Sequence, residues 1–301
     1  MTAQPSPPAA KTGARFRLGA YSTYMLLIPG LVLSVIFLVL PLAIMVVVSF
    51  YTTAPSSTGY LAIFTIQNYV DFFTSPQTGT LVLNTFSLAF IAAIIAFIFG
   101  FPLAYFLTFH IKSAALKNYV ITLLIVPFLI DWSIRTVAWI GILGKAGIIN
   151  STLMSLGLIK GPLEALLFSR NTLYIIWLQT YVVFMEFPIY LAMNRIDPDL
   201  INAAKVLKAP PRHVLYDVVF KLSLPGIMAG FIFVFVSTLG DFITPNLWAG
   251  GVQTLGFSIS RYSNNFLWPY ASVLSTMLLI IALIILVIAF KVVNVKKLFY
   301  E

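Results

Sequence analysis

The sequence of 301 residues has no cysteine, and only 9% of its residues are charged, whereas about a quarter is usual for soluble domains. The lack of cysteine excludes disulfides, thiol catalysis and cysteine-ligated metals. The two histidines, His110 and His213, are solitary and far apart, so we expect no metal site. Without a Gly-x-x-x-x-Gly-Lys-Ser/Thr segment the chain cannot bind ATP by a loop of that type. No nucleophile stands beside a base either, and we do not expect an enzyme.

Apolar residues dominate instead, at 60% of the sequence, and they gather in long runs. A membrane-spanning helix needs roughly 20 such residues, so the length suits about six spans and their loops. We therefore predict an all-α integral membrane protein. The first run is uncharged and longer than the roughly 7 to 15 residues of a cleavable signal core, so we expect it to remain as a span. The expected spans are residues 24–50, 81–109, 119–143, 171–194, 222–239 and 267–290.

The net charge of +9 invites a nucleic-acid interpretation, but membrane proteins collect lysine and arginine in their cytoplasmic loops. With both termini inside, the outer segments hold only Lys145, Lys160, Arg170 and Arg261. We therefore predict six spans with both termini cytoplasmic and no nucleic-acid partner. The bases of the expected cytoplasmic segments are Lys11, Arg15, Arg17, Lys112, Lys117, Arg195, Lys205, Lys208, Arg212, Lys221, Lys291, Lys296 and Lys297.

The chain is expected to form one transmembrane domain, residues 21–294. A disordered basic tail, residues 1–20, precedes it, and a short cytoplasmic tail, residues 295–301, follows it. In the first span Pro29 and Pro41 are expected to produce kinks, because proline removes a helical hydrogen bond.

Three smaller features lie in or between the spans. An interfacial helix is predicted around residues 69–73. The Gly- and Pro-rich residues 240–265 have too many helix breakers for one plain helix, and they are predicted to re-enter the membrane surface. The pattern Gly226-x-x-x-Gly230 either brings two helices into close contact or is a chance match.

The longest charged segment between two apolar runs, residues 195–225, predicts two short helices joined by a turn; we call it the hairpin. Asp197 is placed to cap the first helix, with Pro198 at its first position and Asp199 at the positive end of the helix dipole. Ala209-Pro210-Pro211 ends this helix, because proline lacks a backbone donor and restricts the residue before it. The second helix is expected from residue 212 to 221.

Three acids lie at or near membrane depth: Asp131, Glu186 and Asp241. An ionisable side chain there is costly, so by default it faces a protein interior or a water-filled path. At about 1.5 Å per residue, Asp131 lies about 18 Å and Glu186 about 13 Å from the expected inner ends of their spans. The carboxylates of Asp131 and Glu186 are therefore expected at neighbouring depths in the membrane.

Each of these acids has two interpretations. Asp131 either forms a self-neutralising pair with Arg135, four residues later on the same helix face, or lines a substrate path. Trp139 continues this face and either packs or stacks on an amine. Glu186, beside the helix-breaking Pro188, either binds a cation or is protonated or paired with another helix.

The hairpin resembles the EAA coupling loop of ABC importer permeases, which docks on the ATPase subunit in that family. It shares Ala203-Ala204 after Asp-Pro-Asp-Leu, a helix-breaking turn, and Leu224-Pro225-Gly226 at the start of the next apolar run. The family's usual Glu is Asn202 here, and its usual Gly is Lys208. The resemblance implies that the coupling residues are Asn202, Ala203, Ala204, Lys208, Ala209, Pro210 and Arg212.

Further segments occur in the order seen in spermidine/putrescine-type permeases. They are Pro127-Phe128, Arg135-Thr136-Val137-Ala138-Trp139, Gly147-Ile148-Ile149-Asn150, Gly240-Asp241-Phe242 with Pro245, and Trp268-Pro269. The chain therefore resembles the binding-protein-dependent, MetI-like permeases. The resemblance implies that Asp241-Phe242 is a substrate gate or a binding-protein contact rather than an ordinary surface loop. The residues expected along the substrate path are Asp131, Arg135, Trp139, Glu186, Asp241 and Phe242.

The resemblance also implies partners for this chain in the bacterial inner membrane. These are a related second permease, two cytoplasmic ATPases that bind ATP and magnesium, and a periplasmic or lipid-anchored binding protein. The chain itself, surrounded by lipid, would carry no cofactor. The expected cargo is a polyamine such as spermidine or putrescine, while related permeases carry ferric iron, opines, sulfate or molybdate. A self-sufficient secondary transporter or channel is the alternative, because it would explain Glu186 but not the hairpin.

Overall fold

The computed structural model describes residues 20–54, 59–163, 166 and 168–292. The expected tails, residues 1–20 and 295–301, lie outside this part of the chain except for Ala20. The chain divides into two units, residues 1–47 and 48–301. Each unit is described by itself.

The first unit consists, where described, of consecutive helical segments. These are α1 (Ala20–Ser34), the π-helical η1 (Val35–Val39) and α2 (Leu40–Ser49), whose last residues belong to the second unit. The π-helical turn ends two residues before Pro41, which cannot donate the regular helical hydrogen bond. Every side chain from residue 27 to 44 is exposed. An apolar helix that is exposed all round is suited to lipid or to another membrane protein.

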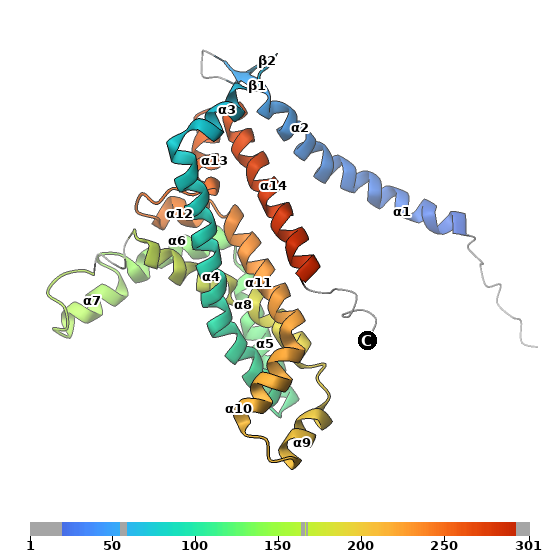
Figure 1. Ribbon diagram of the computed structural model, residues 1–301. Coiled ribbons are helices and arrows are strands. Elements are labelled where there is room, and N and C mark those ends of the chain that lie inside the picture. The colour runs from blue at the N-terminus through green and yellow to red at the C-terminus, as the bar shows by residue number, and fades with distance from the viewer. Residues whose placement is uncertain (1–19, 55–58, 164–165, 167, 293–301) are drawn as a thin grey trace, which may run out of the picture. The chain divides into compact units, whose positions relative to one another are not determined.

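The second unit is a helical bundle with one small β-hairpin, shown in Figure 1. Helices α9 and α10, which belong to the hairpin of residues 195–225, lie at one end of this unit. Helix α3 lies at the opposite end. Its elements are β1 (Tyr51–Thr53), β2 (Tyr60–Phe64), α3 (Gln67–Thr74), α4 (Pro76–Phe109), α5 (Ala114–Ile125), the 3-10 turn η2 (Val126–Leu129), α6 (Trp132–Leu143), α7 (Ile148–Ser155), α8 (Arg170–Met193), α9 (Pro198–Val206), α10 (Pro211–His213), the π-helical η4 (Val214–Phe220), α11 (Lys221–Gly240), α12 (Ile243–Trp248), α13 (Leu255–Asn264) and α14 (Trp268–Val292).

Six segments are long and apolar enough to cross a membrane, which confirms the predicted number of spans within the described chain. The interfacial helix predicted around residues 69–73 is also present, as α3. The antiparallel pairing of β1 with β2 was not predicted. The six segments are Leu27–Ser49, Pro76–Phe109, Trp132–Ser155, Arg170–Met193, Pro211–Gly240 and Trp268–Ala289.

The core of the second unit is formed by α4, α8 and α11. Helix α4 contributes small buried residues, among them Ala89, Ala93 and Ala96, which let neighbouring helices approach closely. The pattern Gly226-x-x-x-Gly230 is a true contact. A Cβ atom at Gly230 would lie 2.8 Å from the Met185 carbonyl oxygen, and one at Gly226 would lie 2.6 Å from the Ala192 Cβ. The absence of side chains at these two positions therefore sets the distance between α11 and α8.

The third expected span, residues 119–143, is not one helix, and this prediction is wrong. Pro127 falls in the turn η2, the chain is extended at Ile130, and Asp131 begins the new helix α6. Proline disfavours a helical conformation in the residue before it and lacks an amide donor. Helices α5 and α6 have 12 residues each. Each therefore rises only about 18 Å, against a hydrocarbon layer of about 30 Å.

The sequence had suggested that the second helix of the hairpin is separate from the fifth span, and this prediction is wrong. The helical segments α10, η4 and α11 follow one another without a break from Pro211 to Gly240. Pro211 occupies the first helical position, where its missing amide hydrogen costs nothing. Residues 212–221 were predicted as a short separate helix, whereas they form the largely exposed first turns of a spanning helix.

The expected re-entrant segment, residues 240–265, contains two short helices, α12 and α13. They are joined through Gly250 and Gly251, both at positive φ, of 56° and 94°. Glycine is suited to such a conformation because it has no Cβ atom.

Candidate functional site

The first helix of the hairpin begins as the sequence predicted. The Asp197 carboxylate accepts a hydrogen bond from the Asp199 amide at 2.9 Å, and Pro198 is the first residue of α9. This bond satisfies one of the amide groups that a helix leaves without a partner at its start. The start of the hairpin helix is thus stabilised locally, while Ile201 packs against the core of the bundle.

The end of α9 shows that Lys208 occupies a position that suits glycine. The Ala209 amide donates to the Ala204 carbonyl at 3.0 Å, and the Lys208 amide donates to the Lys205 carbonyl at 2.9 Å. This pair of bonds is the Schellman ending of a helix, which requires a left-handed residue. Lys208 has that conformation, with a φ of 53°. A lysine there is strained, because its Cβ crowds the backbone.

Replacing Lys208 should therefore stabilise the turn. We expect Lys208→Gly to raise the free energy of unfolding by about 0.5–1 kcal/mol, because the strain removed exceeds the entropy that glycine adds to the unfolded chain. Lys205→Gly, inside α9, is the matched control and should lower it by about 1 kcal/mol. Thermal unfolding of the purified variants measures both, and the same sign for the two changes would contradict this account.

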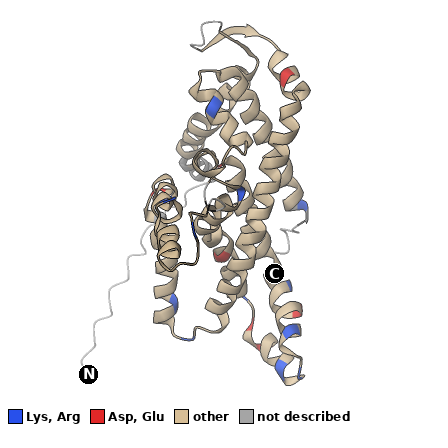
Figure 2. Ribbon diagram, turned by 90° about the vertical axis from the view of Figure 1, so that its left-hand side faces the viewer, with Lys and Arg blue, Asp and Glu red and all other residues tan. Residues whose placement is uncertain are grey.

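The hairpin presents an apolar surface to solvent. Val206 and Leu207 are each 81% exposed, and Leu200 is also exposed. Figure 2 shows Lys, Arg, Asp and Glu gathered in the same end of the unit. Exposed apolar side chains surrounded by charges are typical of a surface that binds another protein. Of the coupling residues implied by the resemblance, Ala204 and Ala209 are half-buried, and the exposed ones are Asn202, Ala203, Lys208, Pro210 and Arg212.

The hairpin is connected to the core through η4. Asp217 lies on this π-helical segment and contacts Lys221 Nζ at 2.7 Å and His213 Nδ1 at 3.2 Å. These are exposed pairs, which contribute little to stability. The mechanical connection is therefore the unbroken helix itself, which leads from the turn at Lys208 to the buried face of α11.

A second polar region lies where the third span is broken. Asp131 is exposed and caps α6, with its carboxylate accepting a hydrogen bond from the Ser133 amide at 2.8 Å. The carbonyl end of α5 and the amide end of α6 both terminate in this region. In membrane transporters, interrupted helices of this kind present their ends to ions and substrates. The sequence indicated Asp131 but not the interruption.

Three tryptophans tie the neighbouring helices together, each through its indole nitrogen. Trp139 of α6 donates to Gln179 of α8 at 3.0 Å, and Trp248 of α12 donates to the Thr136 carbonyl of α6 at 3.2 Å. The third is Trp177 of α8, which donates to the Asp241 carboxylate at 2.6 Å. Trp139 thus packs and hydrogen-bonds within the bundle. Gln179 and Trp177 could not be identified from the sequence, because their partners lie far along the chain.

Asp241 is only 3% exposed, and both of its carboxyl oxygens accept hydrogen bonds. One oxygen accepts from Trp177, and the other accepts from the Thr244 amide at 3.0 Å. Asp241 therefore fastens α8 to the corner between α11 and α12. Phe242 beside it is exposed.

Loss of this connection should be costly. Asp241→Ala leaves the Trp177 indole and the Thr244 amide buried without an acceptor, and we expect it to lower the free energy of unfolding by about 3 kcal/mol. Trp177→Phe tests the same bond from the other side. A double-mutant cycle by thermal unfolding should give a coupling energy above about 1 kcal/mol, and additive effects of the two changes would contradict it.

Glu186 is 2% exposed and projects from α8. Within the part of the chain that the structure describes, neither of its carboxyl oxygens has a hydrogen-bond partner. It lines a cavity of about 20 Å³, formed also by apolar residues of α4, α5 and α8 such as Leu107, Ile121 and Val183. That volume suffices for about one water molecule.

The structure keeps the three acids separate. Asp131 is at the helix interruption, Glu186 is between α4, α5 and α8, and Asp241 is at the corner before α12. Across residues 20–54, 59–163, 166 and 168–292, no three His, Cys, Asp or Glu side chains gather in a way that suits a metal ion. Arg135 and Asp241 do both lie within electrostatic range of the Tyr181 hydroxyl.

Six candidate spanning helices within the described residues and an exposed, partly apolar hairpin are together typical of a membrane subunit that binds other proteins. Residues 96–299 match the family described as binding-protein-dependent transport system inner membrane component, and the chain belongs to this family. It is a permease subunit of an ABC importer in the bacterial inner membrane. This membership excludes an enzyme and decides against a self-sufficient secondary transporter or channel.

Individual relatives agree with this assignment. The spermidine/putrescine transport system permease protein PotB of Haemophilus influenzae is 29% identical over 261 residues, covering 85% of this chain and 89% of the relative. A putative 2-aminoethylphosphonate transport system permease protein, PhnU of Salmonella choleraesuis, is 30% identical over 234 residues, covering 76% and 77%. A crystal structure of a bacterial ABC transporter involved in the import of alginate superimposes with a TM-score of 0.70 at 18% identity, over 93% of this chain and 96% of that one. This last likeness confirms the fold.

Proposed function

We propose that this permease subunit imports polyamines such as spermidine or putrescine. The observation that supports this cargo most directly is the likeness to the PotB proteins over most of both chains. The PhnU protein is named for a different compound, yet 2-aminoethylphosphonate also carries a primary ammonium group. A cargo with a primary ammonium is therefore common to the two assignments.

The acids of the spans fit such a cargo. Asp131 is exposed at the helix interruption and offers a carboxylate to an ammonium group. The cavity beside Glu186 is too small for a polyamine, so an ammonium group reaches this carboxyl only after α5 moves away from α8. Glu186 is thus proposed to meet the cargo in a second conformation. This gives alternating access a specific moving element.

The hairpin is proposed to drive that motion. Its exposed apolar residues dock on a cytoplasmic ATPase, and nucleotide-dependent closure of two such ATPases displaces α9. The displacement passes along the helix from Pro211 to Gly240, whose glycines contact α8 closely. Both termini are proposed to be cytoplasmic. ATP and magnesium are bound by the ATPases and not by this chain, a related permease completes the membrane part, and a binding protein delivers the cargo.

The role of the carboxylates can be tested by uptake. In the assembled importer, we expect Asp131→Asn and Glu186→Gln each to reduce polyamine uptake about ten-fold or more, because an ion pair with the cargo is lost. Asp217→Asn is the matched control and should have little effect, since its pairs are exposed. Unchanged uptake of labelled spermidine in both path variants would disprove the proposed path.

The cargo itself can be determined with the purified importer in proteoliposomes. Spermidine, putrescine and 2-aminoethylphosphonate are offered one at a time, with ferric iron, an opine, sulfate and molybdate as the other candidates. We expect ATP-dependent uptake of the polyamines. Uptake of 2-aminoethylphosphonate alone would show that this compound, and not a polyamine, is the cargo. Uptake of an anion alone, such as sulfate or molybdate, would overturn the proposal of an ammonium cargo.

A further inference from the structure

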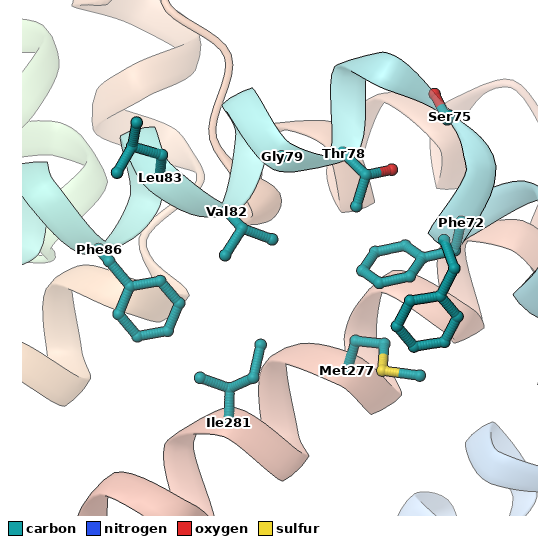
Figure 3. A pocket seen from close by; sticks show the side chains of 10 residues that line it. Phe72, Ser75, Thr78, Gly79, Val82, Leu83, Phe86, Met277 and Ile281 are labelled. Atoms are coloured by element: carbon teal, nitrogen blue, oxygen red, sulfur yellow. The ribbon is translucent and has the colours of Figure 1, made fainter.

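The cavity beside Glu186 differs in kind from a larger one of about 660 Å³ between α3, α4 and α14. In the larger cavity Val82 of α4 faces Ile281 of α14, as Figure 3 shows, and none of the residues that line it is charged. The smaller cavity combines a carboxyl group with an aromatic ring, because Glu186 and Tyr190 both line it. A carboxyl group beside a ring is a combination that attracts a cation.

Glu186 and Tyr190 lie one turn apart on the same face of α8. Their spacing corresponds to about 6 Å along the helix, and Tyr190 is nearer the hairpin. Glu186 is buried, and within the residues that the structure describes its carboxyl oxygens have no hydrogen-bond partner. The half-buried Tyr190 ring does have a partner, because Lys117 of α5 places its Nζ 5.7 Å from the ring centroid. This distance suits an attraction between a cation and the face of a ring.

Lys117 is held at this place by its position on α5. It shares a helix face with Ile121 and Ile125, which follow it one and two turns later and line the same cavity. The lysine is half-buried, and it lies at the end of the contact between α5 and α8 that is nearer the hairpin. A cargo that leaves Glu186 towards the hairpin therefore meets the Tyr190 ring, and the ring is occupied by an ammonium of the protein itself.

The Lys117 side chain has the chemistry of the proposed cargo. It ends in a primary ammonium on a flexible four-carbon stem, and putrescine is the same stem with an ammonium at each end. A ring face that accepts this lysine offers the same attraction to a cargo ammonium of equal charge and shape. The two cations cannot occupy one face together, because like charges repel at that distance. They therefore compete for the ring.

Building on the proposed function, we propose that the Tyr190 ring is a second ammonium site, after Glu186 on the path, and that Lys117 is a competitor tethered to α5. When α5 moves away from α8, Lys117 leaves the ring and a cargo ammonium takes its place. When α5 returns, Lys117 displaces that ammonium towards the hairpin and prevents its return. Release of the cargo is thereby coupled to closure of the contact between α5 and α8.

The ring site can be tested without any cargo, by restoring the missing ammonium to a variant that lacks it. Lys117→Ala removes the propylammonium part of the side chain, so n-propylammonium is the matched probe and 1-propanol is its neutral control. At about ten times its dissociation constant, we expect n-propylammonium to raise the unfolding temperature of the purified Lys117→Ala chain by about 2–4 °C. The double variant Lys117→Ala/Tyr190→Leu should show no rise. An equal rise with 1-propanol, or in the double variant, would overturn the proposal.

A second contact between a lysine and a tyrosine provides the matched control. Lys221 Nζ lies 5.7 Å from the Tyr216 ring centroid, the same distance, but both side chains are exposed. Water competes for an ammonium there, so Lys221→Ala should gain no stability from n-propylammonium. Equal gains in Lys221→Ala and Lys117→Ala would show that an exposed tyrosine ring responds as well, and would overturn a specific site at Tyr190.

The competition is tested by transport in the assembled importer. Lys117→Met keeps an apolar stem without the charge, so we expect labelled spermidine to bind about five-fold more tightly in the absence of ATP and its uptake to slow by a similar factor. Lys117→Arg keeps a cation at the ring and should behave as the wild type. Unchanged binding and uptake in Lys117→Met would disprove the competition.

The ring site and the proposed cargo can fail independently. If n-propylammonium does not stabilise Lys117→Ala while the wild-type importer takes up polyamines, the ring site is wrong and the cargo stands. If n-propylammonium stabilises Lys117→Ala through Tyr190 while the wild-type importer takes up no polyamine, the ring site stands and the assignment of the cargo is wrong.

Discussion

Gly226→Leu should prevent the bundle from forming its native core. The Cβ alone would lie 2.6 Å from the Ala192 Cβ and would also meet the Pro188 carbonyl. Because both neighbours belong to the well-packed α8, relief requires the backbones of α8 and α11 to separate. We expect a loss of more than about 3 kcal/mol, the upper part of the range for overpacked cores. The measurement is the yield and thermal unfolding of the purified chain.

The matched control for this prediction is in the same helix. At Gly240, the last residue of α11, an added Cβ atom would meet nothing within 4 Å, so Gly240→Leu should leave yield and unfolding temperature nearly unchanged. Gly230→Ala is an intermediate case, because its Cβ would be 2.8 Å from the Met185 carbonyl oxygen. If Gly226→Leu unfolds at the wild-type temperature, the proposed contact between α8 and α11 is wrong.

Leu207→Asp should disconnect the permease from its ATPase while leaving the fold intact. Leu207 is 81% exposed, so no core packing is lost. A carboxylate placed in an apolar docking surface must be desolvated there, which we expect to weaken ATPase binding by more than about ten-fold. Uptake should fall to the level measured without ATP. Co-purification of the tagged permease with the ATPase measures the loss directly.

Leu158→Asp is the control for the docking surface. Leu158 is 67% exposed and lies in the segment between α6 and α8, outside the hairpin. The same substitution there should leave ATPase binding unchanged. Equal retention of ATPase by Leu207→Asp and the wild type would show that the exposed apolar residues of the hairpin are not the docking surface.

Local signals in the sequence predicted the parts of this protein that depend on neighbouring residues. The cap at Asp197 and the end of α9 before Pro210 both follow from short-range chemistry, and both are present in the structure. The glycine pattern of α11 had left a close contact and a chance match open, and the structure shows the contact. The resemblance marked Lys208 only as a departure from the family's usual glycine, and the structure shows that this residue has the left-handed conformation that suits glycine.

Long runs of apolar residues concealed the boundaries that matter for transport. Hydropathy stays high through Pro127 and Asp131, so residues 119–143 were predicted as one span although the chain is interrupted there. Conversely, residues 212–221 were predicted as a short helix separate from the fifth span, because the sequence does not show that these exposed turns continue that span. Composition measures the environment of a segment and not the continuity of its backbone.

Contacts between distant residues were beyond the sequence. The hydrogen bond from Trp177 to Asp241 joins residues 64 positions apart, and it gives a carboxylate that was expected at a gate a structural role in the bundle. The small cavity beside Glu186 depends on the packing of three helices. The proposed contact of Glu186 with the cargo is tested by transport measurements.

The central claim is that a separate ATPase moves this chain through a hairpin in the cytoplasm. The chain has no cysteine, so Leu207→Cys supplies a single reactive thiol without further changes. A membrane-impermeant maleimide should label it in inverted vesicles of the assembled importer and not in intact spheroplasts, and bound ATPase should protect it. Labelling from the outer side only, or labelling that the ATPase does not affect, would contradict the account.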